Sequence, residues 1–171
     1  SNPKVNKTVT VDVSASDPDE LTSTADTVTA NNTGYIDLDL KDAFGNGIEG
    51  EEIKVKDDDN LNISNSTRDT DPNGETYFTF MEKDAGDYNP VFEVSSDTSV
   101  SASPSATVRA AETSQLSFSN QPNDTVAGKK IEDSEGSFIE VLGLDDFGNS
   151  NEGFTDSITL STNESSDLQT V

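Results

Sequence analysis

Short runs of alternating apolar and polar residues, separated by turn motifs, recur along the chain. A period of two predicts β-strands, because successive side chains of a strand point to opposite faces. We expect strands at 8–13, 34–42, 51–57, 75–82, 88–94 and 105–110. Their expected inward residues are Val9, Val11, Val13, Ile36, Leu38, Leu40, Ile53, Val55, Phe78, Phe80, Tyr88, Phe92, Val94 and Val108. About seven short strands in about a hundred residues predict an all-β fold, a β-sandwich.

One turn occurs twice in the chain, as DAFGNGIEG at 42–50 and DDFGNSNEG at 145–153. The same shift aligns Tyr35 with Phe138 and Leu38 with Val141. A motif that returns with its flanking strand indicates a repeated module. We therefore expect one sandwich over residues 1–110 and the N-terminal part of a second, incomplete one over 111–171. The second has expected strands at 116–118, near Ile131, at 138–144 and at 157–161, and needs completion by further residues of the same chain or by another subunit.

The composition excludes several classes of function. Asp and Glu number 34 against 10 Lys and Arg, a formal net charge of -24. Such a chain has no basic stripe for nucleic acid, and an anionic membrane surface repels it. The sequence contains no Cys and no His, which excludes thiolate sites, the usual zinc and haem sites and His-based triads. The strong acidity predicts a halophilic protein that loses stability in dilute buffer, where surface carboxylates repel one another over longer distances.

The motifs resemble a known family. The stretch from VTANNTGYIDLDLKDAFGNGIEGEEIKV through TDPNGETYFTF to AGDY is similar to the group 1 bacterial immunoglobulin-like domains of invasin- and intimin-type surface proteins. The resemblance covers most of residues 8–109, and the first half of the pattern again in 116–161. It implies tandem Ig-like β-sandwich modules in an extracellular or cell-surface protein.

The function expected from this resemblance is structural: a spacer or lattice unit of an S-layer, stalk or adhesin array. Its partners are further copies in cis or neighbouring subunits, without nucleic acid or direct membrane insertion. Catalysis is not expected, because the carboxylates lie on outer strand faces and loops without clustered aromatic residues. Two alternatives stay open: an adhesin module that binds a ligand with its end loops, and a filament subunit completed by a neighbouring strand.

The repeated turn admits a structural and a cation-binding interpretation. In the structural one, Asp42 and Asp145 end a strand with an Asx-type hydrogen bond. The pairs Gly45-Asn46 and Gly148-Asn149 then take positive φ, while Phe44 and Phe147 close the end of the sandwich. In the cation-binding interpretation, the carboxylates of the turn form a cation site. Tyr88 resembles the immunoglobulin tyrosine corner, with its ring packed inward at the start of a strand.

Calcium is the one cofactor that the sequence leaves open. In DTDPNGE, the residues Asp69, Asp71 and Asn73 have the spacing of the first ligands of a calcium loop. Phe80 occupies the position where an EF-hand needs a bidentate Glu, so we expect a hairpin turn here. The acidic stretches 17–20 and 57–59 are expected in solvated loops, and the junction VRAAETSQL carries only Glu112 as a carboxylate. Six candidate N-glycosylation sites fit N-x-S/T: Asn6, Asn31, Asn62, Asn65, Asn123 and Asn163.

Overall fold

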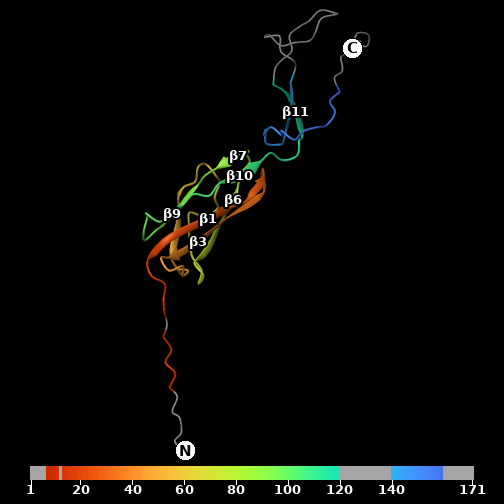
Figure 1. The fold of residues 1–171 in the computed structure, drawn as a ribbon. Coiled ribbons are helices and arrows are strands. Elements are labelled where there is room, and N and C mark those ends of the chain that lie inside the picture. The colour runs from red at the N-terminus through yellow and green to blue at the C-terminus, as the bar shows by residue number, and fades with distance from the viewer. Residues whose placement is uncertain (1–6, 12, 120–139, 160–171) are drawn as a thin grey trace, which may run out of the picture. The chain divides into compact units, whose positions relative to one another are not determined.

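The computed structural model describes residues 7–11, 13–119 and 140–159, and every regular element in this part of the chain is a β-strand. The strands are β1 (Pro18–Ala25), β2 (Thr27–Thr29), β3 (Thr33–Asp42), β4 (Glu52–Asp57), β5 (Thr67–Asp69), β6 (Glu75–Met81), β7 (Gly86–Tyr88), β8 (Val91–Val94), β9 (Ser101–Ala102), β10 (Ala106–Arg109), β11 (Gln115–Phe118) and β12 (Val141–Leu144). The all-β prediction is therefore confirmed (Figure 1).

The first sheet has the order β1-β3-β6 and is antiparallel throughout. Leu21 pairs with Leu40, and Ile36 pairs with Phe78, so their side chains share one face. That face is buried, and Ile36, Leu40 and Phe78 have no exposed surface. Alternation places Asp37 and Asp39 on the other face, which explains how a chain this acidic still builds an apolar core.

A second sheet, in the order β5-β4-β8-β9, supplies the other half of the core. Ile53 on β4 pairs with Val94 on β8, and both are fully buried. The rings of Phe78 on β6 and Phe92 on β8 lie 4.9 Å apart, so the inner faces of the two sheets meet. Two antiparallel sheets with such a shared core form a sandwich.

Two smaller sheets complete the described strands. One has the order β2-β10-β7 and buries Ala106 and Val108 of β10. The other pairs β11 with β12, with Leu116 opposite Gly143. The described residues divide into two compact units: unit 1 lies within Ser1–Thr27, Thr33–Met81 and Asp87–Thr107, and unit 2 within Val28–Asn32, Glu82–Gly86 and Val108–Val171.

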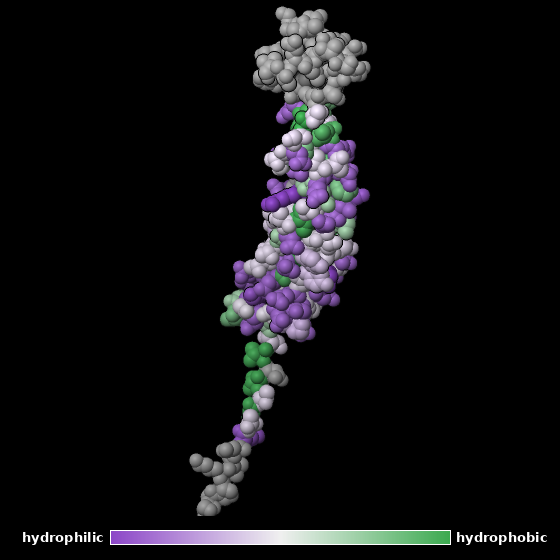
Figure 2. Space-filling view, turned by 90° about the vertical axis from the view of Figure 1, so that its right-hand side faces the viewer, coloured by the Kyte–Doolittle hydropathy of each residue, from purple (hydrophilic) through white to green (hydrophobic). Residues whose placement is uncertain are grey.

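Several expected strand positions are wrong. The described residues between 7 and 17 form no strand, and Val9, Val11 and Val13 are 72%, 75% and 87% exposed, because no other described residue covers them. Figure 2 shows their hydrophobic surface along the extended segment before β1. The stretch 17–20, expected in a loop, instead runs into β1, whose single buried large side chain is Leu21. A strand with one apolar anchor gives too weak an alternation to predict.

The remaining differences are smaller. Tyr88 ends β7 instead of starting a strand, and its side chain is half-buried. Residues 157–159 form no strand, and Ile158 is 40% exposed. The expected strand residues Ile131, Phe138 and Ile139 lie outside the described residues. No helix in the described ranges has the length and apolar character that a membrane span requires.

Candidate functional site

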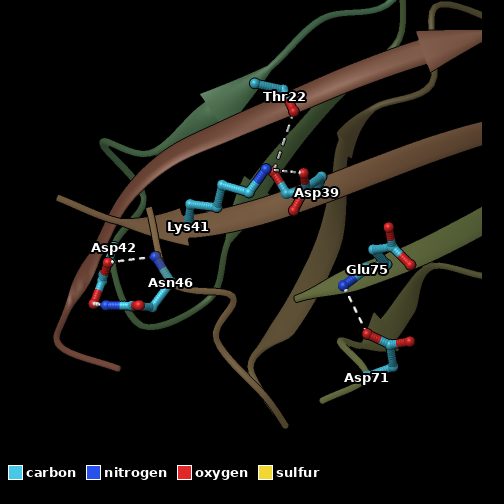
Figure 3. A network of polar contacts seen from close by, with 7 residues as sticks. All are labelled: Thr22, Asp39, Lys41, Asp42, Asn46, Asp71 and Glu75. Carbon is cyan, nitrogen blue, oxygen red and sulfur yellow. Dashed lines mark hydrogen bonds and ion pairs between the residues drawn. The ribbon is translucent and has the colours of Figure 1, made fainter. Parts of the chain in front are cut away.

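The corner that follows β3, residues Asp42–Asn46, is organised by one carboxylate. Asp42 Oδ1 accepts the backbone N–H groups of Phe44 and Asn46, at 2.9 and 2.8 Å. Asp42 Oδ2 accepts the Asn46 side-chain amide at 3.0 Å and the backbone N–H of Ser16 at 2.9 Å. Figure 3 shows Asp42 and Asn46 facing each other across this turn. The carboxylate thus closes its own turn and also holds the chain segment that enters β1.

The corner that follows β12, residues 145–149, repeats these four hydrogen bonds. Asp145 Oδ1 accepts the N–H groups of Phe147 and Asn149, at 2.9 and 2.8 Å. Its Oδ2 accepts the Asn149 amide at 2.8 Å and the backbone N–H of Ala111 at 2.9 Å. The bridge between Lys41 and Gly47 likewise returns between Leu144 and Ser150. The two corners therefore have the same geometry, and this supports the structural interpretation of the repeated turn.

Two expected details of the corners are corrected. Gly45 and Gly148 have positive φ, at 82° and 91°, but Asn46 and Asn149 do not. Each Asn instead places its amide on the Asp carboxylate of its own corner. Phe44 is 83% exposed and so does not close the sandwich.

A segment distant in sequence contacts the second corner inside unit 2. Asn149 Oδ1 accepts the backbone N–H of Ala85 at 2.8 Å, and Asn149 Nδ2 donates to the carbonyl of Lys83 at 2.7 Å. The Lys83 amine lies 5.8 Å from the centre of the Phe147 ring, within the range of a cation–π contact. Phe147 is accordingly only 37% exposed. We call residues 82–86 the clamp segment.

The hydrogen bonds to the two carboxylates change their acidity. The N–H of Ser16 and the Asn46 amide hold the pKa of Asp42 well below its usual range, against a smaller opposing effect of burial. For Asp145, burial acts to raise the pKa, but the Asn149 amide and the N–H groups of Ala111, Asn149 and Phe147 together lower it to about 2. The hydrogen bonds at both corners thus favour the ionised form of the carboxylate.

Two of the calcium candidates, Asp71 and Asn73, lie in a third turn of this kind, and Asp69 ends β5. Asp71 Oδ1 accepts the N–H groups of Asn73 and Glu75 at 2.8 and 2.9 Å, as Figure 3 shows for Glu75. Gly74, at φ 85°, lies so close to the Leu40 carbonyl and to Gly47 that no side chain fits there. The expected turn is present. Asp69, Asp71 and Asn73 are exposed, and the described residues contain no group of three or more carboxylates arranged to hold a metal ion. Calcium binding by these residues stays a prediction.

The other candidate residues in the described ranges are exposed. Asp57 and Asp58 accept the N–H groups of Asp59 and Asn60, and Asp59 Oδ2 accepts that of Asn89 at 2.7 Å. Glu112 is exposed. The glycosylation candidates Asn31, Asn62 and Asn65 are exposed, whereas Asn6, Asn123 and Asn163 lie outside the described residues. Modification of all six stays a prediction.

The outer face of the β1-β3-β6 sheet carries a hollow of about 620 Å³. Arg68 stacks over the Tyr77 ring on this face, 4.2 Å from its centre. Hydroxyl side chains of β1 and β6 and five carboxylates line the wall together with them; the carboxylates are Asp37, Asp39, Asp69, Asp71 and Glu75. The hollow lies on a sheet face and not at the end loops, where the adhesin alternative places a ligand.

Sequence reasoning found the two Asp residues but missed their partners Ser16, Ala111, Lys83 and Ala85. A signal for the first two existed. A shift of 95 residues aligns Val13 with Val108, Ser16 with Ala111 and Leu21 with Leu116. Lys83 and Ala85 carry no such signal, since their contact with Asn149 spans 66 and 64 residues and uses backbone atoms.

Comparison with known proteins gives one family match. The sequence profile of the bacterial Ig-like domain (group 1) matches residues 18–111, more than half of the chain. A search of curated proteins finds no match.

Solved structures resemble the chain at low identity. The Escherichia coli adhesin FdeC is 19% identical, with 80% of this chain and 44% of that chain covered and a TM-score of 0.53. InvD of Yersinia pseudotuberculosis is 17% identical, with 81% and 45% covered and a TM-score of 0.52. The chain thus spans less than half the length of either. At such identities these likenesses support the tandem Ig-like fold alone.

Proposed function

Because the chain belongs to the group 1 bacterial Ig-like domain family, we propose that it is a structural spacer of an extracellular, cell-surface protein. The parent is an S-layer protein, a stalk or an adhesin array. The boundary between two successive modules near residues 110 and 111 is part of this proposal. Its partners are further modules of the same chain or of neighbouring subunits.

One observation supports the proposal: at each corner the Asp carboxylate also binds the chain segment that precedes the next strand pair. Ser16, just before β1, donates its backbone N–H to Asp42 at 2.9 Å. Ala111, just before β11, donates its backbone N–H to Asp145 at the same distance. A charged acceptor of this kind makes a strong hydrogen bond. This hydrogen bond fixes the segment before a strand to the end of a neighbouring strand, and it recurs once per module. Such a bond suits a chain that bears tension along its length.

Pulling a single molecule of the full chain by its two ends tests the mechanical role. Residues 18–109 should unfold in one step that lengthens the chain by roughly 300 Å, at about 3.4 Å per extended residue. Smooth extension at low force would describe a flexible linker and contradict a spacer.

Antibodies against the chain test the location. They should label intact cells of the source organism as strongly as permeabilised cells. Labelling that requires permeabilisation would contradict a place at the cell surface.

A further inference from the structure

The exposed valines before β1 pair with no described residue of unit 1, although their alternation is that of a strand. Val9, Val11 and Val13 are each at least 72% exposed. A contiguous apolar stripe of this kind on an extended segment is a site for pairing with another element. We propose that residues 1–15 are the last part of a preceding Ig-like module, and that the first corner docks the clamp segment of that module. This inference rests on the proposed function as a serial spacer.

The register at the two corners supports the first half of the proposal. Leu21 pairs with Leu40 in β1 and β3, and Leu116 pairs with Gly143 in β11 and β12. Leu21 and Leu116 thus occupy equivalent positions, as do Ser16 and Ala111 by their bonds to the corner carboxylates. Both pairs are separated by 95 residues. The chain that enters β1 is therefore equivalent to the chain that follows β10.

Counting back from Ser16 places two of the three valines on buried positions of β10. Val13 falls on Val108 and Val11 falls on Ala106, which are 2% and 0% exposed. The same shift aligns Val5 with Val100 and Ser1 with Ser96 without a gap. Residues 1–15 thus carry the pattern of residues 96–110, the segment that contains β9 and β10. The first module then begins at Ser16 and not at Ser1.

The corners supply the second half. Asn149 seats the clamp segment through a carbonyl at Lys83 and an N–H at Ala85. Asn46 has the same position and the same bond to its own Asp, but among the described residues its side chain hydrogen-bonds only within its turn. Phe44 is 83% exposed where Phe147, with Lys83 over its ring, is 37% exposed. The first corner therefore presents the same Asn and Phe side chains as the second, but no described segment binds to them.

The occupant is defined by this chemistry. It is a turn that offers a backbone carbonyl and, two residues later, a backbone N–H to Asn46, with a cationic side chain over Phe44. Residues 82–86 of a module of this kind have these groups. The module that supplies them is completed by Val11 and Val13.

An extended chain tests both halves. A copy of residues 18–95 is joined in front of Ser1 of the complete 171-residue chain, so that Ser1–Ala15 take the place of residues 96–110 of the added copy. Val13→Asp should lower the melting temperature of the added copy by about 10 °C or more, because it places a charge in a core. In the 171-residue chain the same substitution should leave melting unchanged, since Val13 is 87% exposed there.

Two results would overturn this half of the proposal. One is equal melting of the Val13→Asp variant and its parent in the extended chain. The other is an added copy that stays unfolded, because residues 1–15 are proposed to complete it.

Cysteine pairs test the docking, and the chain has no native Cys to interfere. In the 171-residue chain, Asn149→Cys with Ala85→Cys should form a disulfide on mild oxidation. In the extended chain, Asn46→Cys with Ala85→Cys of the added copy should form one to a similar extent. As a control, Asn46→Cys with Asp71→Cys of the added copy, which precedes β6 where the clamp segment follows it, should not. A positive Asn149 pair with a negative Asn46 pair would contradict the docking. Neither outcome bears on surface labelling, so the inference and the proposed function can fail separately.

Discussion

The two corners of this chain have the same internal hydrogen bonds and different surroundings. Asp42 and Asp145 each accept two N–H groups on one oxygen, and an Asn amide with an incoming N–H on the other. Yet Asn149 also binds the clamp segment, whereas the Asn46 side chain bonds only to its own turn among the described residues. The local geometry of the turn is therefore independent of what packs on it. The hydrogen bonds within each turn are the same with and without contacts to its Asn and Phe side chains from other segments.

Loss of the second carboxylate should have the largest effect. Asp145→Ala removes four hydrogen bonds from a fully buried group and should lower the stability of unit 2 by about 3 kcal/mol. Amide hydrogen exchange of Gly143 and Leu144 measures this loss. Asp146→Ala, an exposed neighbour in the same turn, is the matched control and should leave exchange unchanged. Equal effects of the two variants would show that Asp145 does not organise the corner.

Acidification should weaken both corners. The folded-state pKa of Asp145 is about 2, below the ordinary 3.8, so the unfolded chain binds more protons as the pH falls. The stability that depends on Asp145 is complete above about pH 4 and is lost between about pH 4 and pH 2. Denaturant unfolding of the wild type and of Asp145→Asn at several pH values separates the contribution of Asp145 to the free energy of unfolding from that of the other carboxylates. The gap between the two should close across that window, and a constant gap would contradict the assignment. Asp42→Asn should behave in the same sense, because the pKa of Asp42 is also lowered.

Asparagine variants sharpen the difference between the corners. Asn149→Ala loses its bonds to Lys83, Ala85 and Asp145 and should cost about 2 kcal/mol in unit 2. Asn46→Ala loses one bond to Asp42 and should cost about 1 kcal/mol or less in unit 1. Exchange of the Ala85 amide reports on the first variant, and thermal melting on both. Similar costs would mean that the clamp segment adds nothing to the second corner.

The phenylalanines should show the smallest effect. Phe147→Ala loses a partly covered ring and its contact with Lys83, for a cost of about 1 kcal/mol. Phe44→Ala should stay within about 0.5 kcal/mol of the wild type, since the ring is largely exposed in this chain. Chemical denaturation of the two variants checks the ranking. A larger loss for Phe44→Ala would restore the view that this ring closes the sandwich.

Much of the core could be predicted from alternation, because the core strands β3, β6 and β8 place an apolar residue on every second position. Ile36, Phe78 and Phe92 are fully buried as expected. Strand β1 could not be predicted, since Leu21 is its one large buried side chain and its pairing with β3 depends on backbone bonds. Conversely, the Val9–Val13 pattern predicted a strand that lacks a partner. Alternation reports which face a strand would bury, but not whether an opposing surface exists.

The sequence by itself determined the sandwich and both turns. An Asp that ends a strand, with Gly three residues later and Asn four residues later, satisfies its own backbone donors, so the corner needs no distant partner. Only the tertiary structure decided what each corner holds. The bond of Asp42 to Ser16 spans 26 residues, and that of Asn149 to Lys83 spans 66. Both use backbone groups, which every residue but proline carries alike, so no side-chain pattern marks them in advance.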